Sequence, residues 1–426
     1  MRSAHDDGDF AHGGGVSRHG DGPSPRADGV SPREDGAFDR RRLFGLSGAL
    51  LLGGLATASC TGHADPRKPS VQAPPPNGVL GVNFNGEPAS VTDRQLQDLT
   101  DTWVRGFVPT QKLDNTAAQE QPTVRRLLDL SSRGFGTVLS LKFPYSGKRV
   151  PEPGEPAMRR ELHRLDELLP AVLGKVDILV IGNEPFIESE HDDQNSGRLN
   201  AFYEHIAQHV VHHKAAPGKT QFYMGSLNHL DDPAWRTAAT ERWMTFTRET
   251  PEIRGVDIHP HLPDPGADRQ YLDYVLPKLR DDQKFLATEF SLVLFWKKHL
   301  KDPVAAEFAQ RHHIDPQKKV WQVVKQAIDE PFPQQKWDDF TTMTPWLHDH
   351  AGYLREQLER FRRTGRLAVA TYGVTQGPSM VEHFNAGSTP WLLNSLYCPF
   401  TVRRRGNGLP GGNLGWVQQF RDAQKS

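Results

Sequence analysis

The sequence has few cysteines, no excess of charge of either sign and no apolar run long enough to cross a bilayer. Its two cysteines, Cys60 and Cys398, cannot build a disulfide framework. With 51 Lys and Arg against 52 Asp and Glu, the net charge of -1 excludes the basic surface typical of a nucleic-acid binder. We therefore expect no nucleic-acid partner. The 426 residues, of which 36% are hydrophobic, are enough to bury a sizeable core.

Residues 1–60 have the composition of a targeting segment. Residues 1–38 are rich in Gly, Asp, His, Arg, Ser and Pro and cannot bury a core, which predicts a disordered lead-in. The basic stretch 39–42 (DRRR) precedes an apolar, glycine-rich run over 46–56. A transmembrane helix needs roughly 20 apolar residues, so this shorter run indicates cleavage rather than retention.

The segment resembles a twin-arginine export signal that ends in a lipoprotein cleavage box, with Cys60 as the lipidated residue. Thr57 stands where such boxes usually carry leucine, and plain cleavage near Ala58 is the alternative. We expect an exported protein that is either anchored to a membrane through Cys60 or secreted or periplasmic. Residues 61–77 are rich in proline and predict an extended linker, followed by a folded domain over 78–426.

From residue 78 onward, short apolar or β-branched runs alternate with stretches of helical periodicity. This pattern predicts strand–helix units around a buried parallel sheet. The expected strands are 79–84, 103–108, 137–143, 176–181, 221–226, 255–259, 284–290 and 367–372. The expected helices include 93–102, 123–133, 157–173, 198–214 and 268–280. We predict the α/β class and a (β/α)8 TIM barrel, with a doubly wound sheet as the competing fold.

The longest connection lies between the seventh and eighth expected strands, from residue 291 to about 366. It contains aromatic and basic segments, and its later part, 348–363, has the periodicity of a barrel helix. We therefore predict a long insertion after the seventh strand.

Two glutamates follow expected strands four and seven. Glu184 comes directly after the apolar run 177–182 and Asn183, and Glu289 follows 285–288. In a TIM barrel the active site is built at the C-terminal ends of the strands, so both carboxylates should face one mouth. Like charge and burial disfavour ionisation of both, which indicates that one is protonated. A protonated and an ionised carboxyl group are the pair that glycoside hydrolysis requires.

The order Asn-Glu-Pro after strand four and Thr-Glu-Phe after strand seven resembles clan A of the glycoside hydrolases, retaining enzymes on (β/α)8 barrels, over residues 78 to about 400. The resemblance implies that Glu184 is the general acid/base, Glu289 the nucleophile and Asn183 a ligand of the sugar 2-hydroxyl. It also implies that Arg105, at the end of strand two, keeps the nucleophile ionised.

Two positions depart from the pattern of the clan. His261 stands on strand six where the clan often carries a tyrosine that contacts the nucleophile, and an imidazole can replace that donor. Strand eight lacks the tryptophan that usually floors the sugar subsite, and Tyr372 or Gln376 is expected to serve instead. We therefore expect a divergent member and assign no family within the clan.

Further polar residues at strand ends are candidates for binding sugar hydroxyls: Asn83, Lys142 and Asn228. The candidates for sugar stacking are Trp296, Trp337 and Trp391, although a tryptophan in a long loop as often holds the loop in place.

His259 and His261 lie two residues apart on one strand and face the same side, so a metal pair is conceivable. Barrel metallohydrolases that resemble this carry such a pair on the first strand, which here has Asn83 between apolar neighbours. We therefore expect no metal and no cofactor, and one of the two histidines as a hydrogen-bond donor to the sugar.

These observations predict a retaining glycoside hydrolase that acts on a poly- or oligosaccharide by double displacement. Glu184 protonates the leaving oxygen while Glu289 forms a glycosyl-enzyme, and Glu184 then deprotonates water. The alternatives are a transglycosylase with the same site, a non-catalytic carbohydrate-binding lipoprotein on a decayed barrel, and a metal-dependent hydrolase that uses His259 and His261. The expected partner is the carbohydrate substrate.

Overall fold

The computed structural model describes residues 71–214 and 219–425. The chain divides into two units, Met1–Arg67 and Lys68–Ser426. The predicted export segment, residues 1–60, therefore lies outside the described residues. None of the described helices is both long and apolar enough to span a membrane.

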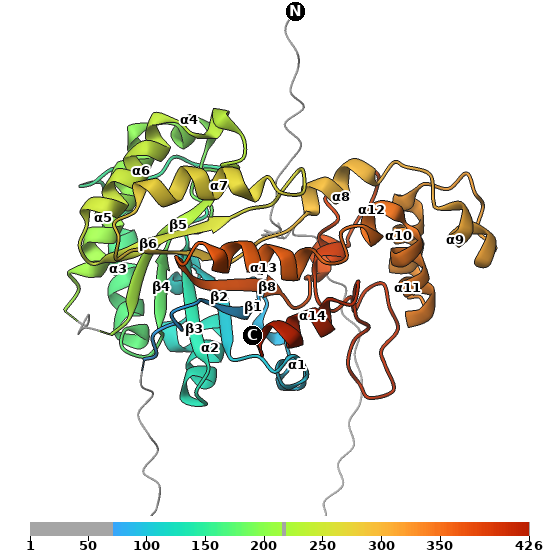
Figure 1. Cartoon of the computed structure of the whole chain (residues 1–426). Coiled ribbons are helices and arrows are strands. Elements are labelled where there is room, and N and C mark those ends of the chain that lie inside the picture. The colour runs from blue at the N-terminus through green and yellow to red at the C-terminus, as the bar shows by residue number, and fades with distance from the viewer. Residues whose placement is uncertain (1–70, 215–218, 426) are drawn as a thin grey trace, which may run out of the picture. The chain divides into compact units, whose positions relative to one another are not determined.

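Eight parallel strands close into a barrel in chain order (Figure 1). They are β1 (Val79–Asn83), β2 (Trp103–Pro109), β3 (Gly136–Lys142), β4 (Ile178–Ile181), β5 (Gln221–Asn228), β6 (Ile253–His259), β7 (Lys284–Ala287) and β8 (Leu367–Gly373). The barrel closes between β1 and β8, where Val79 pairs with Val369 and Asn83 with Gly373. The predicted (β/α)8 fold is confirmed, and the doubly wound alternative is wrong.

Helices connect the strands and cover the outside of the barrel. They are α1 (Asp93–Leu99), α2 (Pro122–Ser132), α3 (Pro156–Val172), α4 (His191–Gln194), α5 (Gly197–Val211), α6 (Ala238–Glu249), α7 (Asp268–Val275), α8 (Val293–His299), α9 (Ala306–Arg311), α10 (Val320–Asp329), α11 (Gln334–Met343), α12 (Pro345–His348), α13 (Tyr353–Arg363) and α14 (Trp416–Ala423). The chain between β7 and β8 runs through α8 to α13. Figure 1 shows α9–α11 on the opposite side of the barrel from α3, α5 and α6.

Local sequence signals set where several helices begin and end. Thr92 and Gln95 form a reciprocal capping box at the start of α1, in which the Gln95 carboxamide accepts from Thr92 N at 2.9 Å. Pro122 and Pro156 occupy the first positions of α2 and α3, where the missing N–H costs no hydrogen bond. Gly174, two residues beyond α3, has a positive φ of 75°, which a glycine adopts without a steric penalty.

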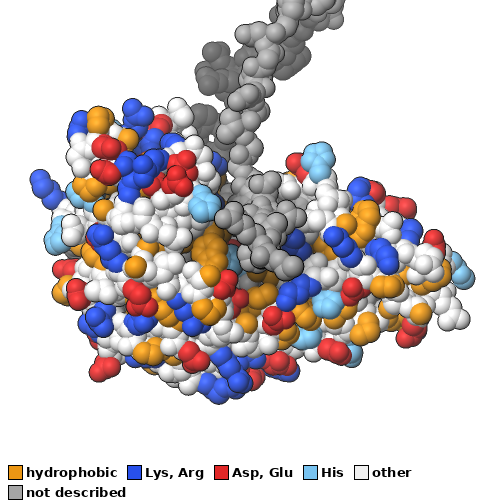
Figure 2. Space-filling view, turned by 90° about the horizontal axis from the view of Figure 1, so that it is seen from above, with side chains coloured by type: hydrophobic (Ala, Val, Ile, Leu, Met, Phe, Trp, Pro, Cys, Tyr) orange, Lys and Arg blue, Asp and Glu red, His pale blue; other side chains and the backbone are white. Residues whose placement is uncertain are grey.

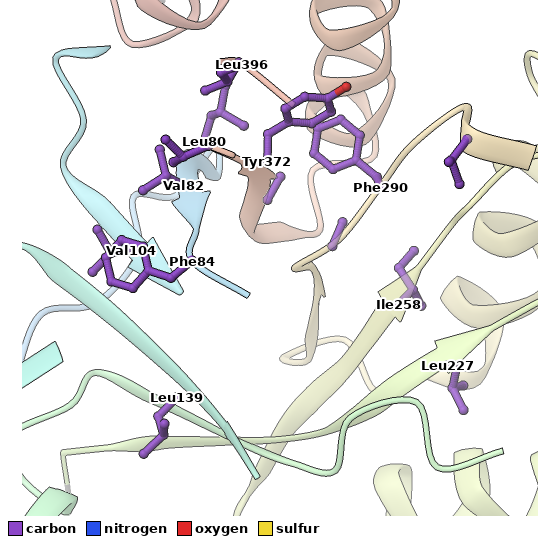
Figure 3. Packing of buried hydrophobic residues seen from close by; sticks show 14 of the residues in the cluster. Leu80, Val82, Phe84, Val104, Leu139, Leu227, Ile258, Phe290, Tyr372 and Leu396 are labelled. Atoms are coloured by element: carbon purple, nitrogen blue, oxygen red, sulfur yellow. The ribbon is translucent and has the colours of Figure 1, made fainter. Parts of the chain in front are cut away.

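The interior of the barrel changes from apolar to polar along the strands. Near the N-terminal ends, apolar side chains pack together in a cluster that includes Val79, Trp103, Val138, Ile178 and Leu286. Two residues further along the same faces stand polar groups such as Arg105, Ser140 and Thr288. The residues between them, including Leu80, Val104 and Leu139, join the larger core outside the barrel (Figure 3). The strand alternation thus directs polar chemistry to the C-terminal mouth.

Several boundaries differ from the sequence-based expectation. β7 ends at Ala287, so Glu289 lies in the loop beyond the strand, whereas β5 continues to Asn228. Part of the predicted linker lies on the barrel, because Gln72 Nε2 donates to Gly134 O at 2.8 Å and Lys284 Nζ donates to Pro76 O at 2.8 Å. Residues 71–77 therefore belong to the folded domain.

Candidate active site

Glu184 reaches the mouth through an unusual backbone turn after β4. Gly182 has a φ of 114°, and a Cβ there would lie 2.0 Å from the carbonyl oxygen of Gly225, so only glycine fits. Glu184 itself has a φ of 48°, in the left-handed region that non-glycine residues rarely occupy. Such strained residues cluster at functional sites, because surrounding contacts must hold them in place.

Arg105 links the mouth of the barrel to Glu289. It lies within β2 and is fully buried, and its Nη1 donates to Oε1 of Glu289 at 2.5 Å. Three further N–H groups are occupied, since the guanidinium donates to Ser140 Oγ at 3.1 Å, Asn83 Oδ1 at 3.2 Å and Asn183 Oδ1 at 2.5 Å. A buried guanidinium with all its sides paired is held in one orientation.

The surroundings of Glu289 favour its ionised form. Burial alone raises the pKa of this carboxyl group, but the positive charges of His259 and Arg105 outweigh burial and hold its pKa below the usual value. The negative charge of Glu184 repels that of Glu289 and by itself raises the pKa of Glu289. These positive charges thus favour the ionised carboxylate of Glu289.

His259 connects Glu184 to a buried carboxylate at the centre of the barrel. Its Nδ1 lies 3.1 Å from Glu184 Oε1, and its Nε2 lies 2.9 Å from Thr288 Oγ1. The Thr288 hydroxyl donates to Asp257 Oδ2 at 2.5 Å, and Ser226 Oγ donates to the same oxygen at 2.5 Å. All of these side chains are buried. The result is one hydrogen-bonded chain from the barrel interior to Glu184.

The charges around His259 favour its protonated form. Burial lowers the pKa of the imidazole, but Glu289, Asp257 and Glu184 together raise it to about 10. A doubly protonated ring donates from Nδ1 to Glu184 and from Nε2 to Thr288, which fits both contacts. His259 therefore holds a proton beside Glu184 at neutral pH.

His261 lies between the two glutamates. Its Nε2 is 3.7 Å from Glu184 Oε1 and 3.8 Å from Glu289 Oε2. Its Nδ1 lies 2.8 Å from Ser291 Oγ, which orients the ring. The indole of Trp391, from the loop after β8, meets the imidazole edge to face at a centroid distance of 4.9 Å. These contacts bring groups from the three connections after β4, β7 and β8 to one imidazole.

Asn183 is held between Arg105 and a second acidic residue. Its Oδ1 accepts from Arg105, and its Nδ2 donates to Glu188 Oε1 at 2.8 Å. Lys142 Nζ donates to the same Glu188 oxygen at 2.5 Å. The amide of Asn183 keeps one further N–H for another acceptor, whereas its carbonyl oxygen serves Arg105.

The other predicted strand-end residues lie at the same end of the barrel. Asn83 accepts from Arg105, and the side chain of Asn85 contacts both Asn83 at 2.7 Å and Gln376 at 3.3 Å. Asn228 is buried at the end of β5, and neither its Nδ2 nor its Oδ1 has a hydrogen-bond partner among the described residues. A buried amide without partners is costly, which favours a ligand-facing role for Asn228.

Two predicted aromatic site residues are structural. Tyr372 is fully buried, donates to Asn394 Oδ1 at 2.9 Å and packs against Phe290 in the outer core (Figure 3). Its neighbour Thr371 bonds to Thr288 inside the barrel, so strand alternation turns Tyr372 outward. Trp296 is fully buried in α8, and its ring packs against that of Trp346 with a centroid distance of 5.5 Å. Both predictions of a sugar contact are wrong, because neither ring reaches the mouth.

Sequence reasoning missed three residues of this site: Asp257, Thr288 and Ser291. The spacing along the strands carried a signal for two of them. Asp257 lies two residues before the candidate His259, and Thr288 lies two residues after the inward-facing Leu286, so each faces the barrel interior. Ser291 lies in a loop and carried none. Trp391, a predicted candidate for sugar stacking, lies against His261.

Outside the mouth, the surface offers no large area of one charge in the view of Figure 2, where Lys and Arg side chains alternate with Asp and Glu. A cavity of about 560 Å³ lies at the opposite end of the barrel, where Gln221, Tyr223 and Lys284 begin or lie near the start of their strands. That end of a TIM barrel serves stability rather than chemistry.

No protein-family model and no curated protein matches the sequence. Among solved structures, the chain resembles a GH10 xylanase from Thermobacillus composti, with 13% identity, 82% of this chain and 97% of that chain covered, and a TM-score of 0.46. It also resembles xylanase 10B from Thermotoga maritima, with 9% identity, coverage of 82% and 97%, and a TM-score of 0.48. A GH113 β-1,4-mannanase shares 10% identity over 83% of this chain and 100% of that chain, with a TM-score of 0.39.

Proposed function

We propose that this chain is a divergent clan A glycoside hydrolase that cleaves a poly- or oligosaccharide with retention of configuration. One observation carries the proposal: two glutamates in different electrostatic surroundings face the same imidazole, His261, at the C-terminal mouth of a TIM barrel. Glu289 is paired with Arg105, whereas Glu184 lies beside the proton of His259. This asymmetry is what a nucleophile and a general acid require.

In the first step the carboxylate of Glu289 attacks the anomeric carbon. The glycosidic C–O bond breaks, and Glu184 transfers its proton to the leaving oxygen. The His259 imidazole next to Glu184 supports this role, because it can share its Nδ1 proton with that carboxylate. Arg105 keeps Glu289 anionic until the covalent bond forms.

In the second step water attacks the glycosyl-enzyme and restores the original configuration. Glu184, now ionised, takes a proton from the water, and Glu289 is the leaving group. Asn228 and the remaining N–H of Asn183 supply polar groups for sugar hydroxyls. A sugar hydroxyl in place of water would make the same site a transglycosylase.

The test measures reducing-end release by the full-length chain from a broad polysaccharide panel. Glu184→Ala and Glu289→Ala should each abolish release, and azide with an activated substrate should partly restore turnover to Glu184→Ala, with a glycosyl azide of retained configuration as the product. Glu307→Ala is the matched control, because the Glu307 side chain is 67% exposed on α9. Proton NMR of the first product anomer distinguishes retention from inversion.

Release that survives both substitutions would contradict the two-glutamate mechanism. If no form releases sugar, thermal shifts induced by the same polysaccharides would favour the non-catalytic carbohydrate-binding alternative.

We also propose export through residues 39–60, on the basis of their sequence alone. Substitution of Arg40 and Arg41 by lysine should retain the protein inside the cell, and Cys60→Ala should abolish lipid labelling. An unchanged distribution of the lysine variant would contradict the proposal.

A further inference from the structure

Three side chains at the mouth converge in the manner of a metal-binding site. Oε1 of Glu184, a ring nitrogen of His259 and a ring nitrogen of His261 all lie within 4.8 Å of one another. Nδ1 of His259 is 3.1 Å from Glu184 Oε1, and Nε2 of His261 is 3.7 Å from it. Ligand atoms around a tetrahedral zinc ion with bonds of about 2.0–2.1 Å stand roughly 3.3 Å apart. The two distances to Glu184 Oε1, 3.1 and 3.7 Å, bracket that value, and the two imidazole nitrogens lie within 4.8 Å of each other.

The outer partners of both imidazoles are those of metal-ligating histidines. His261 uses Nδ1 for Ser291, and its buried Nε2 has no hydrogen-bond partner among the described residues. His259 directs Nε2 to Thr288 and lies 3.6 Å from Asp257 through the same atom, with Nδ1 left for Glu184. Metal-ligating histidines usually contact a carboxylate, hydroxyl or carbonyl through the nitrogen that does not bind the ion.

The local charge also suits a dication. Asp257, Glu184 and Glu289 contribute three carboxylates, and Arg105 is the guanidinium that faces them. Binding of the ion would displace the Nδ1 proton of His259, and two neutral imidazoles with one divalent ion would then balance the charge of these groups. Mixed nitrogen and oxygen ligands favour zinc, copper or nickel over magnesium and calcium, which prefer oxygen alone.

We propose that Glu184, His259 and His261 bind one divalent transition-metal ion, exemplified by Zn²⁺, and that the bound ion withdraws Glu184 from proton transfer. Glu289 Oε2, 3.8 Å from Nε2 of His261, lies close enough to approach the ion as a further ligand. The site differs from the histidine pair that the sequence suggested, because the third ligand comes from the loop after β4. The proposed inhibition of proton transfer by the bound ion rests on the proposed function, whereas the proposed metal binding does not.

The proposed metal binding is tested on the full-length chain without a histidine tag, after removal of metals by a chelator. Zn²⁺ is titrated by calorimetry, and Co²⁺ is used as a spectroscopic probe of coordination. The wild type should bind one Zn²⁺ tightly, and His261→Gln and Glu184→Gln should each weaken that site by about 100-fold or more. His163→Gln, whose side chain is 73% exposed on α3, should bind as the wild type does.

Thermal melts without metal check that each variant is folded. Zinc X-ray absorption should report imidazole nitrogen and carboxylate oxygen as ligands. Wild-type affinity for Zn²⁺ in His261→Gln and Glu184→Gln, sulfur ligands at zinc, or no stoichiometric uptake by the folded wild type would each overturn the proposed metal binding.

The proposed inhibition is tested on hydrolysis by the wild type. Zn²⁺ at the concentration that fills the site should abolish turnover, a chelator should restore it, and Mg²⁺ should have no effect. Turnover that is unchanged when Zn²⁺ fills the site, or turnover that requires the ion, would overturn the proposed inhibition but not the proposed metal binding. A chain that binds Zn²⁺ but hydrolyses no glycan would contradict the proposed function and leave the metal site established.

Discussion

Arg105 on β2 donates from Nη1 to Oε1 of Glu289 at 2.5 Å, although the two residues are 184 positions apart in the sequence. The guanidinium is fully buried, so this pair is shielded from solvent on the Arg105 side. Its partners Asn83, Ser140 and Asn183 come from three further strands or strand ends. One side chain thus orients the nucleophile and ties together the polar end of the barrel.

Replacement of this guanidinium should be strongly destabilising. Arg105→Met leaves the Glu289 carboxylate without its ion pair and should lower the free energy of unfolding by about 3–5 kcal/mol. Urea denaturation measures this change. Arg311→Met is the matched control, because Arg311 is 50% exposed in its pairs with Glu307 and Asp339 and should cost about 1 kcal/mol or less. Equal losses in both variants would contradict the account of Arg105.

The stability of the chain should depend on pH through His259. Its pKa is raised from 6.5 to about 10 in the folded state, so the folded protein binds this proton more tightly than the unfolded chain does. The resulting stabilisation is fully present below pH 6.5 and is lost as the pH rises through about 10.

The substitution His259→Gln removes this pH-dependent stabilisation. In the presence of a chelator, the difference in unfolding free energy between the wild type and His259→Gln should shrink steadily from pH 6.5 toward pH 10. Urea titrations at several pH values measure it. A difference that stays constant or grows over this range would show that His259 is neutral in the folded state.

Trp391 should contribute to sugar binding, because its ring contacts His261 and its side chain is partly exposed at the mouth. Trp391→Ala should raise KM several-fold with a small change in stability. Trp296→Ala is the contrasting variant, since Trp296 is fully buried in α8 and its loss should cost about 3–5 kcal/mol of stability. Thermal melts and initial rates separate the two effects; the reverse pattern would contradict both assignments.

Tyr372 should matter for stability and not for substrate. Tyr372→Phe leaves the buried Oδ1 of Asn394 without its donor and should lower the unfolding free energy by about 1–3 kcal/mol. KM should stay at the wild-type value, because the ring faces the outer core. A raised KM in a variant of unchanged stability would restore Tyr372 to the sugar subsite.

Much of the site could be predicted because strand geometry is regular. Glu184 and Glu289 follow apolar runs, and parallel strands deliver such residues to one edge. The same alternation explains the error at Tyr372, which has the opposite parity from Thr371. The contact of Trp391 with His261 was beyond this reasoning, since no period relates a residue in the connection after β8 to an imidazole in the segment after β6.

The amino-acid sequence by itself determined the eight strands, six of the helices that connect them and the presence of two glutamates after strands four and seven. Hydrophobic periodicity and helix capping depend on residues a few positions apart, so both can be recognised in the sequence alone. Only the tertiary structure decided that His261 lies between Glu184 and Glu289 and that His259 joins Glu184 to Asp257. Barrel closure sets those distances, and burial decides how strongly charges at those distances interact.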